Sequence, residues 1–443
     1  MNIIRYLVTI VLFVVCFLPS QSQDFAPFIE MVWNNNHQLK SHEFELENAR
    51  LSMEEAKAMY RPTVTFGTQY TLASGGRAID FPVGDLLNPV HNTLNELTGS
   101  QQFPQLSNQT ILFLPNNFYD ARFRIQQPVY YPDLSLNRQA KGLEQELRGL
   151  EIKAYKRLLV KEFMDAYFQW KQSLQAIEIY AQAEQLIQEA ARSTGSMIRN
   201  GVALPSALAR IKGELATVTA QQIEAKAIEE NAWSYLIFIA GDPDLSRIEM
   251  SIDLIELPEV NAGENNRREE LQQLDLGLRL NQLAVDKEDN FFKPTLGVQL
   301  DLGSQDFDFG LQPYGLLGIN FNWNLFDGNR HRLRRQQALT KIEVNKERKI
   351  QVQKQFDLQV GIARNNLAAA IDQALTFRPR IEAGESTYHD VEKKYKSGSA
   401  NYLELLDARI QLTQAQITYL VSRFQAWTKW SEYQYNSALY PIP

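Results

Sequence analysis

The sequence predicts an α+β membrane protein whose internally duplicated chain supplies four amphipathic strands and two long helical hairpins. Residues 123–130 and 319–326 both alternate apolar and polar side chains, which is the period of a strand with one buried face. Each segment leads directly into a highly charged helical segment that is far longer than the helices of compact domains. Because the same order occurs in both halves, half of the chain is predicted to be one structural unit.

Residues 1–22 are predicted to be a secretory signal peptide. Arg5 precedes an apolar run at residues 7–18, and small or polar residues follow up to Ser22. A membrane anchor is the alternative, but this run is short for a spanning helix, and no later segment reaches about 18 apolar residues. The only cysteine, Cys16, lies beside the bulky Val15, so we expect no lipid attachment, disulfide or thiolate metal site in the mature chain.

The composition argues against several partners and functions. A net charge of −7 argues against a nucleic-acid partner. The histidines are scattered, and the sequence has neither a glycine-rich phosphate loop nor a Gly-x-Ser-x-Gly elbow, so we predict no enzyme, no metal site and no cofactor. The hydrophobic content of 44% is ordinary for a soluble protein, so lipid-facing surface must be confined to a narrow band, as in a β-barrel.

Each half begins with a helical stretch that ends in an aromatic, a basic and a proline residue, at residues 59–62 and 291–294. Proline cannot continue a helix but fits the first position of a strand. Strands are therefore predicted at residues 63–72 and 295–302, where apolar and polar side chains alternate.

The links between the paired strands differ in length. The first link, residues 73–117, is long and rich in Gly, Asn, Pro and Ser, whereas the second link is short and consists of residues 303–313. Long links on one side of a barrel are typical of its extracellular face. Alternation along the four strands assigns these apolar side chains to lipid: Val64, Phe66, Phe123, Ile125, Leu296, Val298, Leu300, Ile319, Phe321 and Trp323. It assigns these polar side chains to the pore: Arg122, Arg124, Gln299, Asp301, Asn320 and Asn322.

Helical hairpins follow the second strand of each half. Helices are predicted at about residues 137–194 and 329–396, roughly 85–100 Å long at 1.5 Å per residue, and each chain segment reverses at a glycine, Gly201 or Gly398. The apolar spacing fits an 11-residue repeat near the strands and a heptad repeat near the glycines. The helices should therefore run straight near the strands and supercoil near the turns.

Two repeats and a linker make up the predicted mature chain. The repeats cover residues 23–240 and 269–443, the latter with a C-terminal tail. The linker at residues 241–268 is rich in Pro, Asp and Glu, and its apolar stretch at residues 252–257 is predicted to be a short strand.

The strand count predicts an oligomer. Each unpaired backbone group at a sheet edge in lipid costs several kcal/mol, and the smallest transmembrane barrels have about eight strands. Two copies would supply about eight strands around an interior filled by side chains, and three would supply about twelve around a wider one. The polar inner faces favour the wider, water-filled barrel.

The ordered, duplicated set of motifs resembles the TolC-type outer-membrane efflux protein family. Residues 322–330, Asn-Trp-Asn-Leu-Phe-Asp-Gly-Asn-Arg, are similar to the aromatic-Asp-Gly run that follows the family's last strand. Residues 395–399 and 405–409 are similar to its second hairpin turn. The first turn, at residues 199–203, is a looser match because Pro205 follows it and a Leu-Asp-Ala run is missing.

The resemblance implies a location and partners. It implies a homotrimer with a twelve-strand barrel in the lipid of a Gram-negative outer membrane and a twelve-helix tunnel in the periplasm. It also implies docking to a periplasmic adaptor and an inner-membrane transporter, as the passive channel of a tripartite efflux or type I secretion system. The alternative is a secreted coiled-coil structural or adhesive protein, which accounts for the helices and the signal peptide but not for the strands.

Two further sets of residues are candidate sites on the hairpins. The turns should dock the adaptor, although the glycines could simply cap helices: Asn200, Gly201, Val202, Ser397, Gly398 and Ser399. Charged side chains within about five turns of Gly398 should close the tunnel as a ring in the trimer, unless they form a solvated outer face: Glu382, Glu385, His389 and Asp390. Candidate partners of these charges are Arg192, Arg378 and Arg380.

Overall fold

The computed structural model describes residues 25–113, 116–247, 254, 256–260 and 268–442. The described residues form two compact units. The first unit contains those of Met1–Ala49, Leu143–Leu280 and Lys341–Pro443, and the second contains those of Arg50–Gly142 and Asn281–Thr340. The predicted signal peptide, with Cys16, lies outside the described residues.

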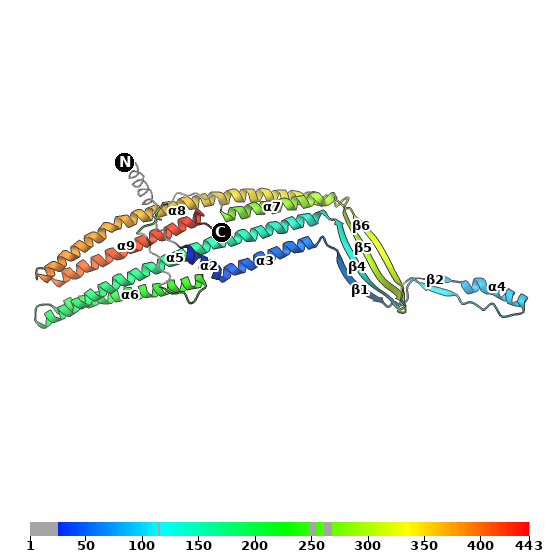
Figure 1. The fold of residues 1–443 in the computed structure, drawn as a ribbon, viewed down its shortest axis with the longest axis horizontal. Helices are drawn as coiled ribbons and strands as arrows, with labels where there is room; N and C mark the ends of the chain where they lie inside the picture. Colours follow the sequence, from blue (N-terminus) through cyan, green and yellow to red (C-terminus); the bar gives the residue numbers. More distant parts are fainter. Residues whose placement is uncertain (1–24, 114–115, 248–253, 255, 261–267, 443) are drawn as a thin grey trace, which may run out of the picture. The chain divides into compact units, whose positions relative to one another are not determined.

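The second unit contains an antiparallel sheet of four strands: β1 (Thr63–Thr71), β4 (Phe118–Tyr130), β5 (Thr295–Phe307) and β6 (Pro313–Asn322). The strands lie in the order β1-β4-β5-β6, so β4 and β5 join the two halves of the sequence, and β1 and β6 are the edges (Figure 1). Alternation of apolar and polar residues thus predicts all four strands, but β5 continues to Phe307, into the link predicted at residues 303–313, and β6 already begins at Pro313.

The last strand is shorter at its C-terminal end than predicted. The sequence predicts a strand that continues to Phe326, but β6 ends at Asn322, which pairs with Thr295 at the start of β5. The residue before Thr295 is Pro294, which has no N–H group to continue the ladder. Trp323 therefore lies outside the sheet, and its indole N–H donates to a backbone carbonyl 2.9 Å away.

The long link between β1 and β4 contains regular structure. Strands β2 (Ala78–Phe81) and β3 (Gln109–Leu112) pair, and helix α4 (Val83–Thr98) lies between them in the sequence. The side-chain amides of Asn88 and Asn95 each exchange two hydrogen bonds with the backbone of one residue, Leu106 and Phe103 respectively. These amides hold the segment that follows α4 against the helix.

Two helical hairpins dominate the rest of the chain (Figure 1). Helices α5 (Pro132–Arg199, 68 residues) and α6 (Pro205–Ala240) form the first, and α8 (Arg330–Lys396, 67 residues) and α9 (Tyr402–Asn436) form the second. The shorter helices are α2 (Ala26–Asn35), α3 (His37–Ala58), α7 (Glu269–Asp289) and the 3₁₀ helix η1 (Asn290–Phe292). The helices and the glycine turns lie where the apolar spacing predicts them.

The core of the first unit is rich in aromatic side chains. Phe163, Tyr167 and Trp170 on α5 are at most 2% exposed, and they pack with side chains from α2, α6 and α9. The rings of Trp170 and Trp233 lie 5.1 Å apart, within the range of a favourable aromatic pair. This core holds the two hairpins together. Within the described ranges, no helix is both long and apolar enough to cross a membrane.

The linker is described only in part. Of the strand predicted at residues 252–257, the residues Leu254, Glu256 and Leu257 are described, and none of them is in a strand. The remaining residues of that prediction lie outside the described residues. The carboxylate of Glu256 accepts a hydrogen bond of 2.6 Å from the hydroxyl of Tyr419 and pairs with Arg378 at 3.0 Å. The linker therefore contacts both helices of the second hairpin.

Candidate functional site

An ion pair joins the two central strands on the polar face of the sheet. Arg124 on β4 lies opposite Asp301 on β5. The guanidinium donates two hydrogen bonds to the carboxylate, with Nε–Oδ1 and Nη2–Oδ2 distances of 2.9 and 2.7 Å. The amide of Gln299 donates to the same carboxylate at 3.0 Å. Such bidentate contacts fix orientation as well as charge, so this face has an ordered polar row.

The remaining predicted pore-lining residues share this face. Arg122 lies two residues from Arg124 and pairs with Asp120 at 2.8 Å. The register of β5 with β6 places Asn320 and Asn322 on the same side of the sheet as Gln299. Strand pairing thus brings all six residues to one face, as their alternation in the sequence indicates.

The opposite face is apolar. Val64, Ile125, Leu300 and Leu317 lie next to one another across the four strands, one from each strand. In the next row, the rings of Phe66 and Phe123 lie 4.9 Å apart. Many of these side chains are exposed, for example Val64 at 64% and Phe66 at 62%. An extended apolar surface of this kind marks a contact with lipid or with another protein.

The sequence reasoning missed one member of the apolar face. Leu317 is 72% exposed and lies on that face, whereas Leu316 lies on the polar face opposite Asp301. Two consecutive leucines carry no alternation, so the pattern alone does not say which of them faces which side. The partner strand decides, because the register pairs Leu317 with Leu300.

Both hairpin turns have the same backbone geometry. Gly201 and Gly398 have φ angles of +72° and +75°, a conformation that glycine adopts without a steric penalty. The N–H of Gly201 donates to the carbonyl of Ile198, and the next N–H, of Val202, donates to Met197. Gly398 and the residue after it repeat this pattern. It is the Schellman motif, which ends a helix at a left-handed residue.

The surfaces of the two turns differ. The first exposes two apolar side chains, Val202 at 76% and Leu204 at 73%. The second is polar, and Asn401 caps helix α9 through a reciprocal capping box with Glu404. A partner that bound both turns would therefore contact an apolar surface at one and polar groups at the other.

The candidate gate residues are exposed on α8: Glu382, Glu385, His389 and Asp390. They flank the half-buried side of α8 that packs on α9. On that side, a Cβ added to Gly384 would lie 3.4 Å from the Cα of Leu412 on α9. Arg378, a predicted partner of these charges, pairs with Glu256 instead. Among the described residues, no group of three or more His, Cys, Asp or Glu side chains is placed to hold a metal ion.

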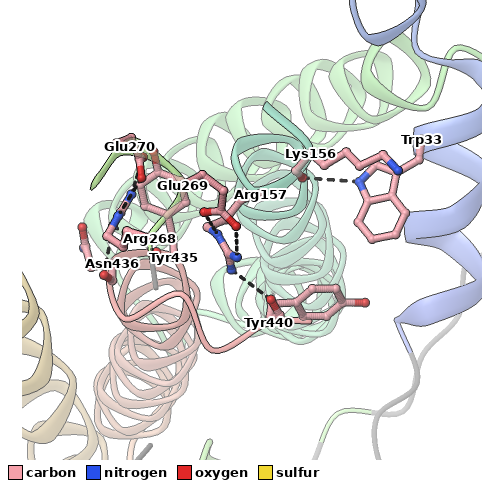
Figure 2. Close-up of polar contacts among 9 residues, drawn as sticks. All are labelled: Trp33, Lys156, Arg157, Arg268, Glu269, Glu270, Tyr435, Asn436 and Tyr440. Atoms are coloured by element: carbon pink, nitrogen blue, oxygen red, sulfur yellow. Dashed lines mark hydrogen bonds and ion pairs between the residues drawn. The ribbon is translucent and has the colours of Figure 1, made fainter. Parts of the chain in front are cut away.

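Two arginines with acidic partners are buried near the start of α7 (Figure 2). Arg157 on α5 donates to both carboxylate oxygens of Glu269, at 3.0 and 2.7 Å, and to the carbonyl of Tyr440 at 2.9 Å. Arg157 thereby links α5 to the start of α7 and to the C-terminal tail. The indole of Trp33 adds a contact from α2 to the carbonyl of Lys156.

Arg268, just before α7, forms the second pair (Figure 2). It donates to both oxygens of Glu270 at 3.0 and 2.7 Å, and to the carbonyl of Asn436 at 2.9 Å. Burial opposes the charged carboxylate, but the hydrogen bonds from Arg268 hold the pKa of Glu270 below its usual value. These contacts attach the start of α7 to the end of α9.

Comparison with known proteins finds a family that resembles the second half of the chain. Residues 264–430 match the family described as outer membrane efflux protein. The second half of the chain is therefore similar to this family.

Solved structures share the fold of this chain over nearly its whole length. A membrane protein from Pseudomonas aeruginosa matches with a TM-score of 0.73 and 14% identity, covering 93% of this chain and 92% of that one. The CmeC outer membrane channel of Campylobacter jejuni matches with a TM-score of 0.73 and 13% identity, covering 93% and 85%. The open state of the MtrE outer membrane channel of Neisseria gonorrhoeae matches with a TM-score of 0.72 and 13% identity, covering 93% and 88%. Among curated proteins, no match was found.

These matches do not support the secreted coiled-coil alternative. The sequence patterns did not reveal the buried arginines Arg157 and Arg268. The run Arg267-Arg268-Glu269-Glu270 was the available signal, but a cluster of charges usually indicates solvent-exposed chain.

Proposed function

We propose that this protein is the outer-membrane channel of a tripartite efflux or type I secretion system in a Gram-negative bacterium. It would be a passive conduit, not an enzyme, for cargo that an inner-membrane transporter drives. The observation that carries the proposal is a sheet with one exposed apolar face and one polar face. A water-filled barrel in lipid requires that division between its two surfaces.

The proposal includes a homotrimer. Within the described residues, β1 and β6 are the edges of the four-stranded sheet, and an edge in lipid must pair because each open backbone group costs several kcal/mol. Three copies would close a barrel of about twelve strands with a water-filled interior. The first unit also exposes large apolar side chains: Leu358 (63%) and Ile362 (48%) on α8, and Phe238 (75%) on α6. Their exposure supports contacts between copies of the first unit.

In this trimer, the polar row around Arg124 and Asp301 lines the pore and the row around Val64 and Leu317 meets lipid. The two repeats, residues 23–240 and 269–443, are copies of one duplicated unit, and the helical hairpins extend into the periplasm. The polar face carries basic and acidic groups in hydrogen-bonded pairs. This arrangement suits a water-filled conduit that does not bind anions or cations strongly.

A periplasmic adaptor docks at the hairpin turns in this proposal. The residues concerned are those predicted from the sequence: Asn200, Gly201, Val202, Ser397, Gly398 and Ser399. Exposure of Val202 and Leu204 supports this assignment, because large apolar side chains at the tip of a turn suit a protein contact. The gate is proposed at Glu382, Glu385, His389 and Asp390, whose exposure on α8 leaves them free to face a central tunnel.

Membrane fractionation combined with heat-modifiable gel migration tests the channel assignment. The mature protein should sediment with the outer membrane and should run as a compact oligomer in detergent until it is boiled. A protein released into the medium, or one whose migration is unchanged by boiling, would instead support the secreted coiled-coil class. A variant with Pro at Ile125, in the central strand β4, is the control, because it removes a ladder donor and should abolish the compact form.

A further inference from the structure

A cavity of about 220 Å³ lies between the two hairpins, close to the second turn. Helices α5, α8 and α9 contribute its walls, which include Ala190, Tyr388, Tyr402 and Leu406. Most of this lining is apolar or aromatic. Two cations also line the cavity, Lys396 on α8 and Arg409 on α9, and Arg409 is only 7% exposed.

Arg409 differs from the other buried arginines of the described residues. Arg157 and Arg268 each form a bidentate pair with a carboxylate. In contrast, Nε and Nη2 of Arg409 are buried and have no hydrogen-bond partner within the described part of the chain. Its guanidinium lies 5.7 Å from the centre of the Tyr388 ring. Burial without a partner lowers the pKa of Arg409.

The acidic side chains near Arg409 form no ion pair with it. Glu392 and Glu189 both line the cavity, but Glu392 pairs with Lys396 at 2.9 Å. A buried guanidinium without a partner is costly. The two donors Nε and Nη2 lie on the same edge of the planar group, which is the geometry that binds a carboxylate side-on.

We propose that this cavity binds a small carboxylate with an aromatic or apolar body. The carboxylate would accept hydrogen bonds from the Arg409 guanidinium, which would turn its buried Nε and Nη2 toward the ligand, and the body would lie near the rings of Tyr388 and Tyr402. The volume suits such a ligand, because apolar cavities of about 150 Å³ bind benzene. A mostly apolar pocket with a few polar or charged groups is the usual form of a small-molecule site, and of the four charged residues that line this one, Arg409 has donors without a partner.

Such a ligand would contact both hairpins of one chain. Ala190 lies on α5, whereas Tyr388 and Arg409 lie on α8 and α9. Binding would therefore favour the arrangement in which the hairpins are packed together. This site is separate from the conduit function, and its test requires no transport.

Equilibrium dialysis of benzoate against the full-length mature protein in detergent tests the site. We expect about one benzoate per chain with a Kd of about 1 mM or tighter. Arg409→Gln should weaken binding by about tenfold or more, because charged hydrogen bonds are lost. Benzyl alcohol, which lacks the carboxylate, should bind the wild-type protein more weakly than benzoate does.

Two further variants distinguish benzoate binding in the cavity from nonspecific binding elsewhere on the protein. Ala190→Leu should abolish binding by filling the cavity while Arg409 remains. Arg210→Gln should leave binding unchanged, because Arg210 is 55% exposed in its ion pair with Asp407 and does not line the cavity. In the absence of benzoate, Arg409→Gln should unfold at a temperature no lower than wild type, since it removes an unpaired buried charge.

Equal benzoate affinity in wild type and Arg409→Gln would overturn the proposal. Absence of benzoate binding to the wild-type protein would also overturn it, and would mean that the cavity holds only water.

Discussion

Arg157 on α5 and Glu269 at the start of α7 form a buried ion pair between residues 112 positions apart in the sequence. Their side chains are only 5% and 7% exposed, and two hydrogen bonds join them. Glu269 also lies in the first turn of α7, where the helix dipole favours an anion. The pair thus fixes where the second half of the chain begins to pack on the first hairpin.

Removing one partner of this pair should be strongly destabilising. Arg157→Met should lower the free energy of unfolding by about 3–5 kcal/mol, because it leaves the Glu269 carboxylate buried and uncompensated. The double variant Arg157→Met with Glu269→Leu should recover most of that loss. Chemical unfolding followed by circular dichroism measures both.

The matched control for the buried pair is Arg148→Met. Arg148 pairs with Glu151, but its side chain is 44% exposed, so its loss should change stability by about 0.5 kcal/mol or less. Equal effects of the Arg148 and Arg157 substitutions would show that the buried pair has no special role.

The pair of Arg268 and Glu270 predicts a pH dependence. Because the pKa of Glu270 is lowered in the folded protein, its stabilising contribution is present above the unfolded value of about 4.3 and is lost as the pH falls through the folded value. Stability should therefore fall on acidification below about pH 4.3, and Arg268→Gln should make that fall shallower. Unfolding midpoints at pH 5 and pH 3 test this, and an unchanged pH slope in Arg268→Gln would contradict it.

Adjacent residues on β6 should respond differently to a charge. Leu317→Arg, in the middle of β6 on the apolar face, should cost about 2–4 kcal/mol, whereas Leu316→Arg on the polar face should be tolerated. Folding into lipid vesicles, monitored by heat-modifiable migration, compares the two. The same loss of folded protein in both variants would mean that the lipid-facing and pore-facing sides are assigned wrongly.

Bulky substitutions at the hairpin turns should block export without blocking assembly. Val202→Trp and Ser399→Trp keep the backbone conformation, whereas Gly201 and Gly398 have positive φ angles that a side chain would strain. Cellular accumulation of a compound whose export requires this channel is the readout, with Glu224→Trp on the exposed surface of α6 as control. Normal export by both turn variants would exclude docking at these residues.

The proposed gate predicts a change in ion conduction. Replacing Glu382, Glu385 and Asp390 together by alanine should raise single-channel conductance and reduce cation preference, because a ring of carboxylates attracts cations. Planar bilayer recordings measure both quantities. If neither quantity changes, the constriction is formed by other residues.

Sequence periodicity predicted the sheet and the hairpins because both depend on repeated local patterns. The strand end at Asn322 was beyond that pattern, since it is set by Pro294 on the neighbouring strand. Periodicity did not predict helix α4 either. The segment after α4 is held by hydrogen bonds from the side-chain amides of Asn88 and Asn95, and as isolated residues these indicate a loop. The faces of Leu316 and Leu317 were decided by register rather than by residue type.

The buried arginines show a similar limit. Nothing in the local sequence distinguishes Arg157 and Arg409, on long charged helices, from the exposed arginines around them. Their burial arises from packing between helices far apart in the sequence. For the same reason, the pairing of Arg157 and the unpaired state of Arg409 became visible only in the folded chain.

The central claim is that three chains complete one barrel from four strands each, and the mass of the intact particle tests it most directly. Native mass spectrometry of the mature protein, extracted in a detergent that preserves its heat-modifiable form, should give the mass of three chains. The edge strands β1 and β6 require this, because neither has a partner in the four-stranded sheet described for one chain. A particle with the mass of one chain, with the heat-modifiable form intact, would contradict the account.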